Sequence, residues 1–218
     1  MYRYQGLFRA LAYSLLLISS SSTALAQSTA NQTLDELLES IDTLSAEVLQ
    51  LIIECDGGVL EESAIQMHLK RPNGFYWETL DPFPELVVTD GSTLWNYQPD
   101  LEQVVLEDWD SSRSELAAKL LSGDTEGLHE EYTVVLREND DEEFNTFDLI
   151  PIAADSVYDV ITINFIEAEL GSIRVSNKNG QRTVWEFQQV QRNPDLDENL
   201  FSFDIPADIE VIDNSSGA

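Results

Sequence analysis

The chain has 218 residues, of which 43% are apolar and 24% charged, so it is long enough to form a globular domain with a sizeable core. Asp and Glu number 41 against 11 Lys and Arg, which gives a formal net charge of −30. Because nucleic-acid binding requires clustered basic side chains, this composition excludes a nucleic-acid-binding protein.

The first 26 residues have the pattern of a secretory signal peptide. Arg3 and Arg9 precede an apolar stretch at 11–18, and Ala24-Leu25-Ala26 forms a small-x-small cleavage site. We expect residues 1–26 to be this signal and residues 27–218 to be a single exported domain. The apolar stretch is short for a membrane span, and no cysteine follows the cleavage site, so we expect neither a membrane helix nor an N-terminal lipid anchor.

Two segments have apolar residues at helical spacing. The first is predicted as a short amphipathic helix at 33–42, with Thr33 and Glu36 in capping-box register. The second spans Ser111–Leu121, with Gly123 as a C-terminal stop. The apolar faces comprise Leu34, Leu37, Leu38 and Ile41 in the first helix, and Leu116, Ala117, Leu120 and Leu121 in the second.

From about residue 44 onwards, the chain consists of short runs rich in β-branched, aromatic and alternating residues, separated by turn signals. This pattern predicts a meander of antiparallel strands. The expected strands are 46–55, 60–69, 74–80, 85–90, 93–98, 102–107, 131–138, 143–150, 158–166, 170–176 and 182–190. Residues 205–218 are expected to be a mobile end.

A meander of about 11 strands has to curl, and the two helices must bury their apolar faces. The simplest arrangement is a strongly curved sheet whose open concave side is covered by the helices. Such a fold can also act as a container, because its interior is apolar and its outer face polar.

Residues that could carry catalysis are few. His68 and His129 are far apart in sequence, and His68 is interpreted as an ordinary strand residue. Cys55, the single cysteine, excludes an internal disulfide and is interpreted as a small, half-buried apolar residue. Acidic runs at 140–143 and 193–199 could suggest calcium binding, but the second run lacks the Gly and Glu of a calcium loop, and solvated loops are the preferred interpretation. We therefore expect no catalytic residue, metal or cofactor.

Aromatic residues recur on the expected strands, at Phe75-Tyr76-Trp77, Trp95-x-Tyr97 and Trp185-x-Phe187. Residues two apart on a strand share one face of the sheet. A plain aromatic core and a cavity lined by aromatics both account for this pattern.

The segments Leu69–Trp77, Val88–Tyr97 and Leu101–Val104 resemble the LolA family of outer-membrane lipoprotein carriers. The likeness rests on Lys-Arg-Pro-Asn-x-Phe-x-Trp, followed by Asp-Gly-x-x-Leu-Trp-x-Tyr, and on the closing Phe-Ser-Phe-Asp-Ile-Pro at 201–206. It extends over the whole mature chain, although Gly74 stands where the family often has a larger apolar residue.

The resemblance implies a mainly β fold with short helices: an unclosed, strongly curved antiparallel β-barrel capped by a helical lid. It implies a monomeric periplasmic chaperone, not an enzyme, that takes acylated lipoproteins from an inner-membrane ABC transporter to a LolB-like outer-membrane acceptor. Arg71 matches the family arginine that holds the lid shut. Phe75 matches a position that meets acyl chains and partners, and Trp77, Trp95 and Tyr97 would line the cavity.

Two other functions are open at this stage. One is a lipid-binding regulatory or sensor module of the same fold, and the other is a secreted hydrolase that uses Glu78 and Asp81. The strong acidity fits either a saline habitat or basic docking surfaces on the partners.

Overall fold

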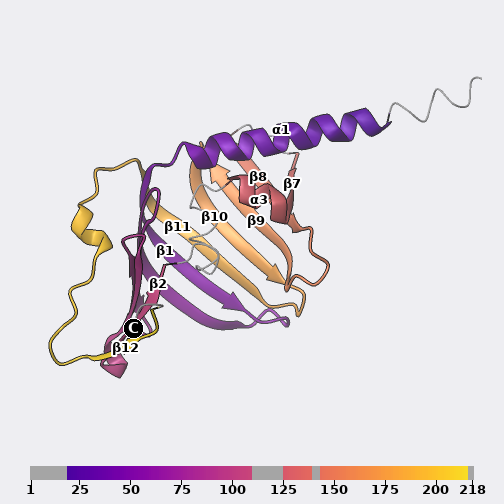
Figure 1. The fold of residues 1–218 in the computed structure, drawn as a ribbon. Coiled ribbons are helices and arrows are strands. Elements are labelled where there is room, and N and C mark those ends of the chain that lie inside the picture. The colour runs from indigo at the N-terminus through magenta and orange to yellow at the C-terminus, as the bar shows by residue number, and fades with distance from the viewer. Residues whose placement is uncertain (1–18, 110–124, 139–142, 216–218) are drawn as a thin grey trace, which may run out of the picture.

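The computed structural model describes residues 19–109, 125–138 and 143–215. Within these residues, twelve strands form one curved sheet, accompanied by two α-helices and two short 3₁₀ helices (Figure 1). The helices are α1 (Ser19–Glu39), α3 (Thr125–Glu131), η1 (Pro99–Leu101) and η2 (Glu198–Phe201). The strands are β1 (Thr43–Ile53), β2 (Val59–Lys70), β3 (Gly74–Asp81), β4 (Glu85–Thr89), β5 (Thr93–Gln98), β6 (Gln103–Asp108), β7 (Tyr132–Leu136), β8 (Phe144–Pro151), β9 (Tyr158–Ile166), β10 (Glu169–Asn177), β11 (Arg182–Arg192) and β12 (Glu210–Asp213).

The strand order is β12-β6-β5-β4-β3-β2-β1-β11-β10-β9-β8-β7. An unclosed, curved and mostly antiparallel sheet agrees with the predicted fold class. The prediction of a single continuous meander was wrong, however, because β6 and β7 follow one another in the chain but lie near opposite edges of the sheet. The two halves are joined by the pairing of β1 with β11, for example Gln50 with Trp185.

Helix α1 is longer than the sequence predicted and ends earlier, at Glu39. Thr33 is not its N-cap: the Thr33 hydroxyl lies within the helix and donates to the carbonyl of Thr29 at 2.9 Å. The segment 19–32 contains no Gly or Pro, so nothing in it interrupts helical hydrogen bonding. A capping-box pattern therefore gave the wrong start, because a Thr inside a helix can bond the preceding turn instead.

The C-terminal segment is also ordered beyond the point predicted. Residues 210–213 form β12, which pairs in parallel with β6 and becomes an edge of the sheet. Before β12, the chain runs past the outside of the sheet and includes η2 (Figure 1). Phe201 of η2 is buried, so this segment has apolar contacts that the sequence pattern alone did not reveal.

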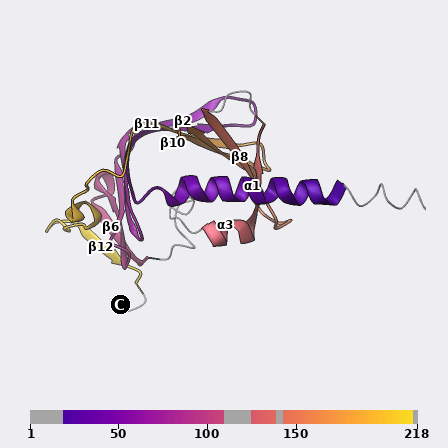
Figure 2. The same ribbon diagram turned by 90° about the horizontal axis from the view of Figure 1, so that it is seen from above.

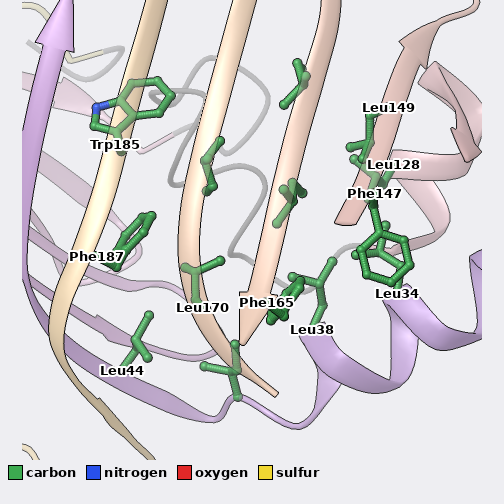
Figure 3. Packing of buried hydrophobic residues seen from close by; sticks show 14 of the residues in the cluster. Leu34, Leu38, Leu44, Leu128, Phe147, Leu149, Phe165, Leu170, Trp185 and Phe187 are labelled. Carbon is green, nitrogen blue, oxygen red and sulfur yellow. The ribbon is translucent and has the colours of Figure 1, made fainter. Parts of the chain in front are cut away.

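The main core lies on the concave face, around which the sheet curves with α1 and α3 on the open side (Figure 2). Alternation along the strands puts every second side chain there: Leu44, Ala46 and Val48 of β1 are buried, as are Ile161 and Ile163 of β9. Side chains of α1 and α3 point into the same space (Figure 3).

Several sequence predictions lie outside the described residues. They are the helix at 111–121 with Leu116, Leu120 and Leu121, and the basic and apolar parts of the signal peptide. Its expected cleavage site, by contrast, lies in the backbone of α1. Among the residues described, no helix is both long and apolar enough to cross a membrane.

Candidate functional site

The concave face of β2 and β3 is apolar next to the end of α1. Met67 and Leu69 of β2 and Phe75 of β3 are at most 4% exposed. Phe75 stacks on Trp77, two residues along β3, with ring centroids 5.9 Å apart. Trp77 is only partly buried. The register pairs Leu69 with Phe75 and Met67 with Trp77, so these four side chains form a continuous apolar surface.

Helix α1 covers another part of the same core, where it contacts β7 and α3. Ala30, Leu34 and Leu38, spaced four residues apart, are buried in the main core, and Leu37 is partly buried against it. Ile41, which follows the helix, is also buried. All four leucine and isoleucine positions predicted for the first helix therefore contact the core, as Figure 3 shows for Leu34 and Leu38.

Arg71, just after β2, holds the C-terminal end of α1. Its Nη2 donates to the carbonyl oxygen of Leu38 at 2.6 Å, and its backbone N–H donates to the carbonyl of Asp42 at 2.9 Å. Carbonyls in the last helical turn lack intrahelical partners and carry partial negative charge, which favours a cation here. Burial lowers the pKa of Arg71, opposed by the carboxylates of Asp42 and Glu39, and the guanidinium stays charged at physiological pH.

The connection between α1 and β1 is held from the other half of the chain by Asn193. Its Oδ1 accepts from the backbone N–H groups of Asp42 and Thr43, at 2.8 and 3.2 Å. Its Nδ2 donates to the carbonyl of Ser40 at 3.0 Å. One side chain thus satisfies three backbone groups where the chain leaves the helix. No sequence motif signalled this role.

Farther from α1, the concave face opens into a cavity of about 350 Å³. It lies between the end of β1 and β2 and the connection from β3 to β4. Aromatic and polar residues both contribute to the wall. The lining residues are Gln50, Glu61, Ser63, Trp77, Thr79, Pro82, Phe83, Glu85, Val87 and Trp185.

Trp95 and Tyr97 lie on the opposite face of the sheet from Phe75 and Trp77. Trp95 pairs with Val88, which pairs with Tyr76, and residues directly opposite one another share a face. Tyr97 packs against Phe203 of the C-terminal segment, with ring centroids 5.0 Å apart. The prediction that Trp95 and Tyr97 line the cavity was therefore wrong, because the strand register turns both side chains to the outer face, where Phe203 packs on Tyr97.

The profile of the family "Outer membrane lipoprotein carrier protein LolA" matches residues 39–204. The chain belongs to the LolA family.

Relatives of similar length support this membership. An outer-membrane lipoprotein carrier protein from Chromohalobacter salexigens is 37% identical over 87% of this chain and 90% of its own. One from Pseudomonas paraeruginosa is 34% identical over 94% of this chain and 98% of its own. An uncharacterized conserved protein from Thermus thermophilus has a similar fold, with a TM-score of 0.55 at 14% identity, over 82% of this chain and 98% of its own.

In this LolA family member, the sequence signalled neither Asn193 nor several residues of the cavity. Gln50, Ser63 and Phe83 carried no motif. Trp185 stood out only as an aromatic two residues from Phe187, and both are buried in the main core. Strand alternation could have placed Gln50 and Ser63 on the inward face, but it could not have brought β11 next to β1 or placed Phe83, which lies in the connection from β3 to β4.

The two acids considered for a hydrolase do not converge in the cavity. Glu78 shares the outer face with Tyr76, and its Oε2 accepts a hydrogen bond of 2.6 Å from the Tyr76 hydroxyl. Burial, together with this bond, raises the pKa of Tyr76. Asp81 is exposed at the end of β3.

Proposed function

We propose that this protein carries acylated lipoproteins through the periplasm, holding the acyl chains between the concave face and α1, which acts as a lid. The observation that carries the proposal is the way α1 is held against the sheet. Leu34 and Leu38 pack into the apolar core, and Arg71 bonds to the end of the helix. The family and the names of the relatives support lipoprotein as the cargo.

Loading requires α1 to move. The cavity of about 350 Å³ lies at the small end of ligand pockets, which span roughly 300–1,000 Å³, whereas a triacylated lipoprotein has three long chains. When α1 leaves, acyl chains take over the apolar contacts of Leu34 and Leu38. Exchange of one buried apolar surface for another costs little net free energy, because both states keep hydrocarbon away from water at about 25 cal/mol per Å².

The carrier must also release its cargo. Apolar contacts are non-directional, so acyl chains can leave the concave face without breaking specific bonds. Re-formation of the contact between Arg71 and Leu38 then favours the empty, closed state. Binding and release of this kind involve no covalent step.

The delivery route belongs to the same proposal. An inner-membrane ABC transporter supplies the lipoprotein and a LolB-like acceptor at the outer membrane receives it. Residues 1–26 direct export and are removed, so that α1 begins near Gln27 in the mature carrier. Support for the route comes from the family and from the small-x-small site at 24–26.

A direct test uses the purified mature protein and a triacylated lipoprotein. We expect a soluble one-to-one complex, with the cargo chemically unchanged after transfer to acceptor-containing vesicles. Size-exclusion chromatography and mass spectrometry of the acyl chains measure both results. Cargo that stays aggregated in the presence of the protein, or acyl chains that are cleaved, would contradict the carrier function.

A further inference from the structure

The concave face changes from apolar to polar along β1. From the end next to α1, the inward side chains of β1 are Leu44, Ala46 and Val48, and the next is Gln50. Gln50 stands directly between Ser63 of β2 and Trp185 of β11. Ser63 is only 2% exposed, so it is a buried hydroxyl within the cavity wall. Figure 1 shows α1 at one end of the sheet and the hairpin between β1 and β2 at the other.

The orientation of the Gln50 amide follows from its partner. The Nε1–H of Trp185 lies 2.7 Å from Oε1 of Gln50, and an indole nitrogen can only donate. The amide oxygen must therefore face Trp185, which leaves both N–H groups of Nε2 as donors. Among the described residues, this bond is the one that involves the Gln50 side chain, so its amino group is available to a ligand in the cavity that it lines.

The two carboxylates of the cavity wall already have donors from the protein. Ser63 donates to Oε1 of Glu61 at 3.0 Å, and Gln98 donates to Oε1 of Glu85 at 3.0 Å. Thr79, on the same wall, provides a hydroxyl. Amide and hydroxyl donors beside aromatic rings suit a ligand part that has carbonyl acceptors on an apolar body.

We propose that this polar end of the cavity binds the ester and amide carbonyls at the acylated cysteine of the cargo. Gln50 Nε2 is the main donor, the acyl chains run from there towards α1, and the polypeptide leaves over the hairpin between β1 and β2. The inference rests on the proposed function and adds to it the direction in which the cargo lies. The apolar surface near α1 holds hydrocarbon, and the polar end holds the part that carries oxygen.

Gln50→Glu tests the donor, because a carboxylate still accepts from Trp185 but has no N–H to offer. The ligands are a triacylated cysteinyl tetrapeptide and its uncharged analogue, in which alkyl groups replace the ester and amide groups. We expect Gln50→Glu to weaken binding of the first by about five-fold, the factor for one net hydrogen bond, and to leave the second unchanged. Gln191→Glu, at an exposed position, adds the same charge and controls for it.

The outcomes separate the two proposals. If neither peptide binds to the wild-type protein, the carrier function itself fails. If both bind and Gln50→Glu weakens them equally or not at all, the carrier function stands and the assignment of Gln50 is overturned. Thermal unfolding of the variant confirms that it is folded.

The direction of the cargo has its own measurement. Cys55 is exposed, and not half-buried as predicted, at the tip of the hairpin between β1 and β2. A benzophenone attached to it therefore samples that end. Ser40→Cys in a Cys55→Ser background places the same group beside the end of α1. We expect photo-crosslinks from Cys55 to the peptide part of the bound lipopeptide. Peptide crosslinks from position 40 instead would overturn the proposed direction.

Discussion

Nε2 of His129 on α3 lies 2.8 Å from Oδ1 of Asp35 on α1, which joins the two helices that cover the concave face. Both side chains are about one quarter exposed, at 22% and 27%. Helix α3 has seven residues, and a helix this short depends on tertiary contacts for its stability. Together with Leu128, which is buried in the main core, this contact gives α3 a fixed position against α1.

Asp35→Ala should therefore loosen α3 more than the sheet. Because the pair is partly exposed to solvent, we expect a loss of about 0.2–1 kcal/mol, seen as faster amide exchange in residues 125–131 with little change in β9 and β10. Glu36→Ala removes an exposed neighbouring carboxylate that interacts within α1 and serves as the control. Equal exchange rates in both variants would show that the pair does not hold α3.

Arg71→Leu should release the end of α1. The lost bond joins a charged donor to a backbone carbonyl, and such bonds are worth about 1.5–3 kcal/mol when shielded, so we expect the lower part of this range for a partly buried group. The variant should take up lipoprotein but hand it to the acceptor more slowly, because re-formation of the closed state no longer favours release. Arg71→Lys retains the charge without the planar fork, so its rate of handover should lie between those of the wild-type protein and Arg71→Leu. Wild-type transfer kinetics for Arg71→Leu would contradict the role.

Phe75→Glu should abolish handover, but it should also impair folding, because Phe75 is 2% exposed within the main core and a buried unpaired charge is costly. Phe75→Leu separates the two effects. Loss of the aromatic contact with Trp77 should lower stability by about 1–2 kcal/mol in chemical unfolding. If Phe75 meets acyl chains, lipopeptide affinity measured on the folded variant should fall as well. Unchanged affinity would make Phe75 a packing residue.

Gly74→Ala should disturb the contact with the C-terminal segment. A Cβ at this position would lie 3.1 Å from two ring atoms of Phe201 and 3.0 Å from the carbonyl oxygen of Lys70. We expect a destabilisation of about 1–3 kcal/mol from overpacking, with faster proteolysis at 193–209. In a Phe201→Ala background the same substitution should cost less, because the ring is absent. An equal loss of stability in both backgrounds would show that the cost comes from the carbonyl oxygen of Lys70 and not from the ring of Phe201.

His68 should make stability fall in mild acid. Burial lowers its pKa, although the carboxylate of Glu78 acts in the opposite direction, so the folded state binds a proton less readily than the unfolded state. Between the lowered pKa and the unfolded value of about 6.5, the unfolded state carries more protons, and stability decreases as pH falls through this window. His68→Phe, which retains a ring next to Tyr76, should flatten that part of the stability curve. An unchanged slope would contradict this origin.

The sequence by itself determined strands β1 to β11, most of their turns and the family. Alternation at Leu44, Ala46 and Val48 follows from the two-residue period of a strand, and the Asp90-Gly91 turn breaks the chain between β4 and β5 without help from distant residues. The side of α1 that faces the core could also be predicted, because Leu34 and Leu38 repeat at helical spacing.

Tertiary structure decided which face each strand turns inward and which strands meet. A period of two shows that Trp95 and Tyr97 share a face, but it does not show which face is turned inward. In the structure both lie on the outer face, where Phe203 of the C-terminal segment packs on Tyr97. The bond between Trp185 and Gln50 joins residues 135 positions apart, and such contacts form only when the two halves of the sheet pair. The cavity depends on that pairing, because its walls come from strands that are distant in sequence.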